Sequence, residues 1–298
     1  MKITLFNFNG ILDELVNELH KTGDLVQDWH EADTLVMWQD VIGNMEEIAV
    51  QAKMLGKRVI VAEHGLLSIN DYIPPLNRPL IADTFMAWGN WTKSWLVKAG
   101  IPKEKVVVTG TLLTKKIIPR REHKDKRVLF APRHWDRELQ ENLEVAAELK
   151  ECKYDVFSKL LEGENNPADY PRPLSTDRQG LNHIDTCFHT LSWADVVVGI
   201  GEGTFGALTH LMDIPYISVD NWTQKDLLGK TYTREEFISQ ISPAAIQVPL
   251  ESLNKQIELC IKDPDLNKKD REWFRKECLN YPGDPVKEIL KTIYGKEN

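Results

Sequence analysis

The stretch that most constrains the fold is residues 194–220, ADVVVGIGEGTFGALTHLMDIPYISVD. Its first seven residues form an apolar, valine-rich run, which is typical of a buried strand. A helix is predicted at 205–212 and a further strand at 214–219. The loop that joins the first strand to the helix is Gly201-Glu202-Gly203-Thr204.

This loop has the residue types that suit an anion. A glycine-rich turn between a buried strand and a helix directs backbone N–H groups at whatever lies beyond the sheet edge. The positive end of the helix dipole adds to this, so a phosphate group is the expected ligand. The alternative interpretation is a tight strand–helix turn without a ligand.

The rest of the chain alternates between predicted strands and helices, which indicates parallel sheets covered by helices. The other strands are predicted at 2–8, 33–38, 57–62, 80–88, 105–109, 127–131 and 154–158. The other helices are predicted at 12–20, 45–55, 91–98, 138–150, 183–193, 233–240, 250–261, 270–278 and 285–294, with a loop at 162–180.

Residues 118–127 interrupt this alternation with Pro119 and a basic cluster, so they mark a domain boundary. The predicted class is therefore α/β, with an N-terminal Rossmann-like domain at 1–120 and a C-terminal one at 121–281. The basic cluster, which we define as Arg120, Arg121, His123, Lys124, Lys126 and Arg127, is interpreted as a solvated linker.

Composition excludes several classes of protein. The 298 residues carry a net charge of −8, whereas a general nucleic-acid binder normally has a basic face. No apolar run reaches the roughly 18 residues of a transmembrane helix, and the N-terminus does not have the pattern of a signal peptide. The four cysteines are widely spaced and form no CxxC pair, so a cytoplasmic protein with free thiols is expected.

Common cofactor and metal motifs are missing from the sequence. It contains no Gly-x-x-x-x-Gly-Lys-Ser/Thr phosphate loop, no G-x-G-x-x-G at the first strand–helix turn and no His-Glu-x-x-His. Asp263-Pro264-Asp265 is formally an Asp-x-Asp pair, but its position after a helix favours helix capping. We therefore predict neither a metal site nor a bound cofactor.

A histidine follows the predicted strand at 57–62, in the sequence Glu63-His64-Gly65. Ligands of parallel α/β proteins bind at the carboxyl ends of the strands, where His64 is expected, and Gly65 would let the chain turn there. Imidazole has an ordinary pKa of about 6.5, so His64 could serve as a general base. The alternative is a loop histidine that only hydrogen-bonds the turn.

Five stretches occur in order: EHG, VVVTGT, VLFAPRHW, YDVFSK and the segment at 194–220. Together they resemble glycosyltransferases of the GT-B type, in which two Rossmann-like domains face a central cleft. The similarity is greatest to capsule polysaccharide and CDP-glycerol glycerophosphotransferase-like enzymes. A more distant similarity is to UDP-N-acetylglucosamine 2-epimerases.

The resemblance implies a role for particular residues. His64 matches the histidine that takes the proton from the acceptor hydroxyl. Arg133, His134, Lys159, Gly201, Glu202, Gly203 and Thr204 are the expected donor and phosphate-binding residues, and Gly65, Gly110 and Asp220 are expected at the cleft. The helix at 285–294, within the segment 282–298, resembles one that crosses back onto the N-terminal domain.

Two departures from the family pattern leave the donor open. The helix after the glycine-rich turn reads Gly206-Ala207-Leu208-Thr209, where the family has a ribose-binding carboxylate, and Glu202 could replace it in part. Lys159 is followed by two leucines, whereas the family has a Lys/Arg-Pro-His run.

The function expected from the resemblance is metal-independent transfer of a sugar from a nucleotide-sugar donor to the hydroxyl of a glycan, a polymer or a modified nucleobase. Three alternatives remain open: a sugar-nucleotide 2-epimerase or hydrolase, a phage DNA-base glycosyltransferase, and a non-catalytic nucleotide-binding scaffold. An epimerase would need more carboxylates than Glu63 and Glu202.

Overall fold

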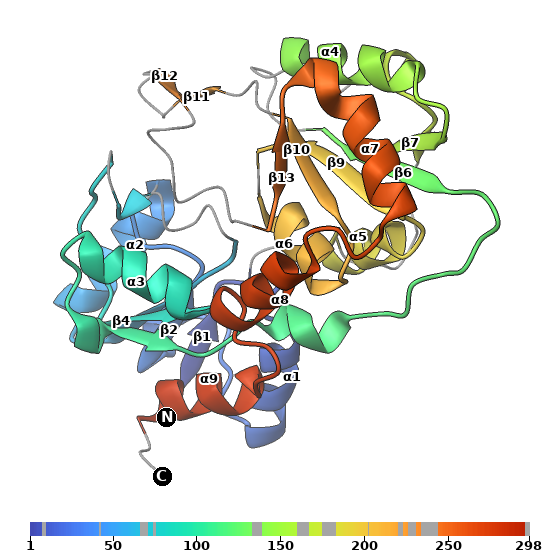
Figure 1. Ribbon diagram of the computed structural model, residues 1–298. Helices are drawn as coiled ribbons and strands as arrows, with labels where there is room; N and C mark the ends of the chain where they lie inside the picture. Colours follow the sequence, from blue (N-terminus) through green and yellow to red (C-terminus); the bar gives the residue numbers. More distant parts are fainter. Residues whose placement is uncertain are drawn as a thin grey trace. The chain divides into compact units, whose positions relative to one another are not determined.

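The computed structural model describes residues 1–7, 10–41, 43–65, 71–73, 76–132, 139–159, 167–174, 183–201, 203–219, 223–225, 231–233 and 244–295. The chain divides into two compact units (Figure 1). The first unit consists of Met1–Lys115 together with Arg275–Asn298, and the second of Lys116–Phe274. Each unit is an α/β unit with its own parallel sheet.

The first unit contains a five-stranded parallel sheet in the order β1-β2-β3-β4-β5. Its strands are β1 (Ile3–Leu5), β2 (Thr34–Met37), β3 (Arg58–Ala62), β4 (Thr84–Ala87) and β5 (Val106–Val108). Its helices are α1 (Asp13–Thr22), α2 (Gly43–Met54), α3 (Asn90–Lys98) and α9 (Pro285–Tyr294), and α8 (Lys268–Glu277) ends within this unit. The order of these strands in the sheet follows their order in the chain.

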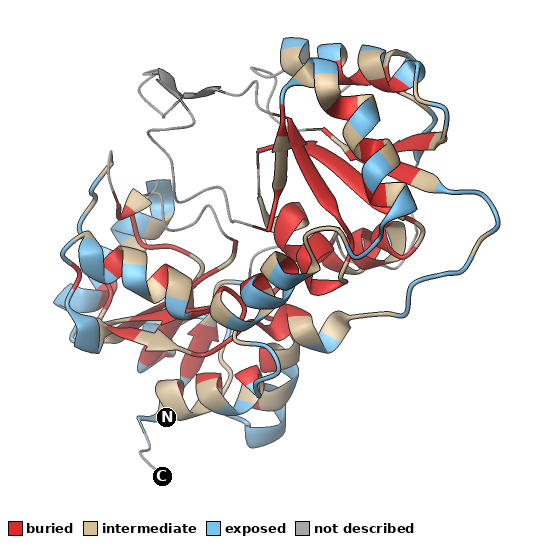
Figure 2. Cartoon of the chain, viewed as in Figure 1, coloured by how far each residue is buried: buried red, intermediate tan, exposed pale blue. Residues whose placement is uncertain are grey.

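Local sequence explains where these elements form. The strands are short apolar runs whose side chains are almost all buried (Figure 2), and burial of apolar surface is the main term that stabilises them. Helix α1 ends at Gly23, which adopts a left-handed conformation with φ 72° that a glycine tolerates without strain. The predicted strands and helices of this unit are therefore confirmed, with ends shifted by a few residues.

The C-terminal helix α9 is attached to the first unit by polar contacts. The Arg58 guanidinium donates hydrogen bonds to the carbonyls of Ile293 at 2.7 Å and Thr292 at 2.9 Å. A cation at the end of a helix satisfies its last carbonyls and interacts favourably with the helix dipole. The hydroxyl of Tyr294 also bonds the Asp24 carboxylate.

The second unit contains a six-stranded parallel sheet in the order β13-β10-β9-β6-β7-β8. The strands are β6 (Arg127–Ala131), β7 (Asp155–Lys159), β8 (Pro173–Leu174), β9 (Val196–Ile200), β10 (Tyr216–Val219) and β13 (Ile246–Val248). The helices are α4 (Leu139–Lys150), α5 (His183–Leu191), α6 (Thr204–Leu211) and α7 (Leu253–Lys262), together with most of α8. Helix α4 packs with α7 and α5 packs with α6, and the two pairs cover opposite faces of the sheet (Figure 1).

Several short strands were missed by the sequence patterns. The two-residue strand β8 lies within the predicted loop at 162–180, and β13 lies where no element was expected. Strands β11 (Thr223–Lys225) and β12 (Thr231–Thr233) form an antiparallel pair. The helix predicted at 233–240 is wrong at Thr233, and its remaining residues lie outside the described ones. Strands of two or three residues depend on backbone pairing with a neighbour, which leaves almost no periodic signal.

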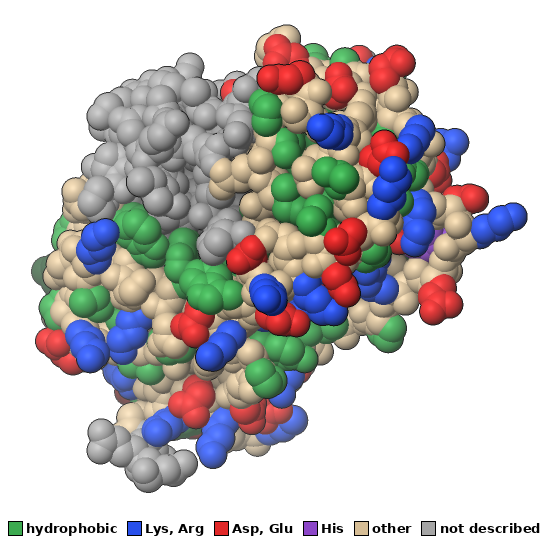
Figure 3. Space-filling view, in the orientation of Figure 1, with side chains coloured by type: hydrophobic (Ala, Val, Ile, Leu, Met, Phe, Trp, Pro, Cys, Tyr) green, Lys and Arg blue, Asp and Glu red, His purple; other side chains and the backbone are tan. Residues whose placement is uncertain are grey.

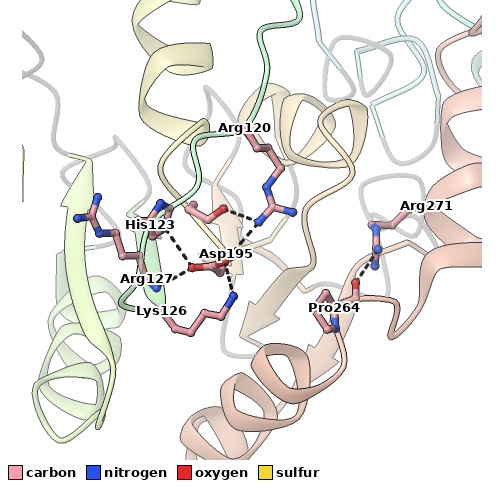
Figure 4. Close-up of polar contacts among 8 residues, drawn as sticks. Arg120, His123, Lys126, Arg127, Asp195, Pro264 and Arg271 are labelled. Atoms are coloured by element: carbon pink, nitrogen blue, oxygen red, sulfur yellow. Dashed lines mark hydrogen bonds and ion pairs between the residues drawn. The ribbon is translucent and has the colours of Figure 1, made fainter.

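The basic cluster at 120–127 is anchored to the second unit rather than fully solvated. The carboxylate of Asp195 lies 3.6 Å from Arg120, 3.2 Å from His123 and 3.3 Å from Lys126, and it accepts the backbone N–H of Arg127 at 2.9 Å (Figure 4). Asp195 directly precedes β9, so one acidic residue ties the start of β6 to the start of β9. The single negative charge of Asp195 offsets one of the five Arg and Lys charges of the cluster.

A buried arginine joins α8 to the sheet of the second unit. Arg271 is 1% exposed and donates a hydrogen bond to the Asp213 carboxylate at 2.9 Å. It also donates one to the carbonyl of Pro264 at 3.0 Å (Figure 4). These bonds hold the loop between α7 and α8 against the turn before β10. The Asp263 carboxylate accepts the N–H of Asp265 at 3.2 Å, which is a turn contact after the end of α7 rather than the cap of a helix N-terminus.

The four cysteines are free thiols. None of the helices in the described ranges is long and apolar enough to cross a membrane. On the face drawn in Figure 3, acidic and basic side chains are interspersed within each unit. The described part of this face has no large patch that is only acidic or only basic.

Candidate functional site

The second unit has a topological switch point between β6 and β9. From β6 the chain winds outward through β7 to β8, then returns to the other side of β6 and winds through β9 and β10 to β13. The loops that follow β6 and β9 therefore diverge at the carboxyl ends of two neighbouring strands. In open α/β sheets this divergence opens a crevice, and ligands bind there.

The loop after β9 contains the glycine-rich stretch, which we call the glycine turn (residues 201–204). Gly201 has φ 68°, in the left-handed region that favours glycine. The hydroxyl of Tyr216, on the adjacent strand β10, donates a hydrogen bond to the Gly201 carbonyl. The aromatic ring fits only because residue 199 has no side chain, since a Cβ there would lie 2.2 Å from the Tyr216 hydroxyl oxygen. Gly199 and Tyr216 thus act together to fix the start of the turn.

Helix α6 begins directly after this turn, with Gly203 as its N-cap and Thr204 as its first residue. No side chain among the described residues caps it, and a glycine cannot do so. The first N–H groups of a helix have no partner within the helix, so they are available to an acceptor at this end. The backbone at Thr204 therefore has the properties of an anion site.

Lys159 brings a positive charge to the side chain of Phe205, the second residue of α6. It is the last residue of β7 and is 2% exposed, and its ammonium nitrogen lies 5.3 Å from the ring centroid of Phe205 in the first turn of α6. No ion pair joins it to a carboxylate within the described residues. A buried cation beside the positive end of a helix is electrostatically unfavourable unless an anion binds between them. The contact between Lys159 and α6 thus points to an anionic ligand.

Four predicted site residues lie outside the described residues, namely Arg133, His134, Glu202 and Asp220. The structure therefore brings together Gly201, Gly203, Thr204 and Lys159 in the second unit. The carboxylate missing from α6 is not replaced within the helix, where Gly206 to Leu211 are all buried and the Thr209 hydroxyl donates to the Phe205 carbonyl at 2.8 Å.

His64 lies at the carboxyl edge of the first sheet, two residues after β3. Its Nδ1 lies 3.0 Å from the carbonyl oxygen of Trp38, which follows the neighbouring strand β2, and the two rings meet edge to face at 5.0 Å. The N–H at Nδ1 therefore donates to this carbonyl, which leaves the lone pair on Nε2. Burial lowers the pKa of His64 to about 4, although the hydrogen bond to Trp38 acts in the opposite direction. The imidazole is consequently neutral at pH 7.

The preceding residue, Glu63, has a structural role that the sequence did not reveal. Its carboxylate is 2% exposed and accepts hydrogen bonds from the Trp88 N–H at 2.6 Å and the Thr92 hydroxyl at 2.9 Å. Burial raises the pKa of Glu63 to about 8, against the effect of these two bonds. Glu63 thus holds the β4–α3 turn against the end of β3 and keeps the backbone beside His64 in place.

Gly65 and Gly110, the two glycines expected at the cleft, lie in different surroundings. Gly65 is a buried residue at a bend and does not have a positive φ. Gly110 has φ 80°, and a Cβ there would lie 3.4 Å from the Pro285 side chain and 3.6 Å from the Leu279 carbonyl. The left-handed φ accounts for a glycine at position 110, because a Cβ there would make only ordinary van der Waals contacts.

Among the described residues, no group of three or more His, Cys, Asp or Glu side chains is placed so that it could hold a metal ion.

The fold is shared with known structures, although the sequence is not. No protein-family model matches the chain, and no curated protein matches it in sequence. The two units match GT-B proteins, so the chain has the GT-B fold with two Rossmann-like domains.

Three solved structures illustrate the similarity. UDP-GlcNAc 2-epimerase from Methanocaldococcus jannaschii, in complex with UDP-GlcNAc and UDP, matches with a TM-score of 0.58 and 15% identity over 97% of this chain and 82% of its own. The wall teichoic acid polymerase TagF matches with a TM-score of 0.62 and 11% identity over 99% and 88%. Anabaena HepE, in complex with UDP-glucose, matches with a TM-score of 0.58 and 11% identity over 99% and 100%. At these identities the similarity establishes the fold alone.

Proposed function

We propose that this protein is an enzyme that acts on a nucleotide-activated sugar and transfers the sugar to an acceptor hydroxyl. The observation that carries the proposal is the placement of buried Lys159 against the first turn of α6, at the switch point of the second sheet. Structures of the same fold include proteins in complex with UDP-GlcNAc or UDP-glucose, which supports a nucleotide sugar as the ligand.

The second unit would bind the donor diphosphate. As the bond to the sugar breaks, negative charge accumulates on the leaving group. The N–H groups at the start of α6 and the Lys159 ammonium group would stabilise this charge without a metal ion. Arg133 and His134, which follow β6, are proposed to contact the same phosphates.

His64 of the first unit is proposed as the general base. Its Nδ1–H is fixed by Trp38, so Nε2 would take the proton of the acceptor hydroxyl. Neutral imidazole is the form required of a base, and His64 has this form above a pH of about 4. The low pKa also means that the protonated form of His64, which arises when it takes the proton, is costly.

Donor binding is tested with two matched variants. Lys159→Met removes the buried charge and keeps the length of the side chain, and UDP affinity measured by calorimetry should fall by at least about ten-fold. Lys262→Met removes an exposed charge from the same unit, and its affinity should match the wild type. Equal affinities for the wild type and Lys159→Met would contradict the phosphate site.

Sugar transfer is tested separately from binding. In His64→Ala, we expect turnover of a bound nucleotide sugar to fall by about 100-fold or more while UDP affinity stays within about two-fold. A screen of UDP-, GDP-, CDP- and dTDP-sugars by thermal shift identifies the donor, because a ligand of the folded state raises its stability. Near-normal turnover of His64→Ala would exclude His64 as the base.

A 2-epimerase is the second candidate, since epimerases share this fold. We do not propose Glu63 as an epimerase acid or base, because its two oxygens accept hydrogen bonds from Trp88 and Thr92. The two functions differ in a simple assay. An epimerase inverts the C2 centre of a UDP-sugar without any acceptor, which proton NMR detects, whereas a transferase leaves that centre unchanged.

A further inference from the structure

A cavity lies within the second unit. Its volume is about 370 Å³, and it is lined by residues of α5 and of the strands β6, β7 and β8. Arg127 and Asp155, the first residues of β6 and β7, form part of its wall. The cavity begins at these first residues and continues along β7 to Phe157 and to Leu174, which pairs with Lys159 in the sheet. The volume falls in the range of small-molecule sites.

One part of the lining is apolar and flat. Phe157 of β7, Leu174 of β8 and Trp193, which follows α5, line the cavity. The Trp193 ring is held in place, because the guanidinium carbon atoms of Arg121 and Arg127 lie 4.4 Å and 4.9 Å from its centroid. This rigid apolar wall suits a hydrocarbon or ring body of a ligand.

The charged part of the lining has more positive than negative groups. Arg127 and Arg172 both pair with Asp155, which is the one carboxylate among the described lining residues. The backbone N–H of Arg127 is bonded to Asp195, whereas its guanidinium points away from that carboxylate (Figure 4). Two guanidinium groups that share one carboxylate leave a net positive charge at the cavity, which favours an anion.

Two buried nitrogen atoms of lining residues have no hydrogen-bond partner within the part of the chain that the structure describes. They are Nε of Arg127, which lies 3.9 Å from Asp155 and is too far for a hydrogen bond, and Nδ1 of His189 on α5. A buried polar atom without a partner is costly, and such atoms are rare in native proteins unless a ligand or water satisfies them. Acceptor oxygens within the cavity would bind those nitrogen atoms of the Arg127 and His189 side chains that face it.

We propose that this cavity binds a small organic oxyanion, in which a carboxylate or phosphate group is attached to an apolar ring body. The oxyanion would contact Arg127, Arg172 and His189, and the ring would lie against Phe157, Leu174 and Trp193. The proposed site shares no residue with the glycine turn or Lys159, although its lining residue Leu174 pairs with Lys159 in the sheet.

The test is a titration of the full-length protein, followed by NMR of the histidine ring protons and by calorimetry. Phenyl phosphate and benzoate are the two anionic probes. Benzyl alcohol tests the ring without the charge, and inorganic phosphate tests the charge without the ring. We expect saturable binding of at least one anionic probe in the millimolar range or tighter, with a shift of the His189 ring signals. The preferred probe shows whether phosphate or carboxylate is the better ligand.

Two variants locate the binding. Arg172→Gln and His189→Phe should each weaken the preferred probe by about ten-fold, because each removes a donor to a charged oxygen. Lys262→Met, on the exposed side of α7, is the matched control and should bind like the wild type. Circular dichroism of each variant verifies that the fold is retained. The shift of the His189 ring signals in the wild-type protein reports probe binding without any substitution.

Several results would overturn the proposal. The first is the absence of saturable binding by both anionic probes. The second is binding without any shift of the His189 signals or with unchanged affinity in both variants, since this would place the probe elsewhere. The third is equally tight binding of benzyl alcohol, which would exclude recognition of the charge.

Discussion

Gly199→Ala is expected to disturb the glycine turn without changing any residue of the turn itself. An alanine Cβ would lie 2.2 Å from the Tyr216 hydroxyl oxygen and 2.9 Å from the ring carbon that bears it. Both distances are too short for non-bonded atoms, so the ring of Tyr216 must move. This movement breaks its hydrogen bond to the Gly201 carbonyl.

The cost can be worked from these two effects. Overpacking of a buried position destabilises by about 1–3 kcal/mol, and the lost hydrogen bond adds about 1 kcal/mol. Gly199→Ala should therefore lower the free energy of unfolding by about 2–4 kcal/mol, measured by urea denaturation. Because the turn loses its support, UDP affinity measured by calorimetry should fall as well.

Tyr216→Phe separates the two effects, since it removes the hydroxyl group alone and should cost about 1 kcal/mol. In the double variant with Gly199→Ala, the 2.2 Å contact is absent, so the two changes should cost less together than their sum. Gly23→Ala is the control for backbone strain, since Gly23 has φ 72° and an alanine Cβ there would have no heavy atom within 4 Å. A Gly199→Ala protein with the wild-type free energy of unfolding would refute this account of the turn.

Three other residues give separate predictions. Because the pKa of Glu63 rises from 4.5 to about 8 on folding, its stabilising contribution is complete below pH 4.5 and is lost as the pH rises to 8. This loss amounts to up to about 5 kcal/mol in the free energy of unfolding. Glu63→Gln cannot titrate, so its free energy of unfolding, measured by denaturation across that pH range, should not show this loss. Arg271→Met should lower the free energy of unfolding by about 2–4 kcal/mol, since it removes hydrogen bonds to the Asp213 carboxylate and to two carbonyls; a loss under about 0.5 kcal/mol would contradict this. Arg58→Met should cost about 1–3 kcal/mol and speed proteolysis of α9, and unchanged proteolysis would contradict the proposed attachment.

The sequence was sufficient to predict the α/β class and most of the long elements. Regular alternation between short apolar runs and amphipathic helices identified strands such as β2, β3 and β9 and the helix α6, because each run reflects burial of its own side chains. The glycine turn was visible for the same local reason, since its glycines and threonine lie close together in the chain.

Other features depend on residues that are distant in the sequence. The strand order of the second sheet, and with it the switch point between β6 and β9, follows from pairing that no local pattern records. The same is true of the contact between Lys159 and Phe205 and of the convergence of the basic cluster on Asp195. Glu63 also could not be assigned, because its partners Trp88 and Thr92 belong to the next strand–helix turn.

The sequence by itself therefore predicted most of the longer strands and helices and which loop could bind a phosphate. The tertiary structure alone decided that a buried lysine lies against the Phe205 ring in α6, that Tyr216 supports the loop from the next strand, and that a cavity forms among α5, β6, β7 and β8. Local structure depends on neighbouring residues and on the period of apolar side chains. A site depends on side chains from different strands, and their proximity is fixed only when the sheet is assembled.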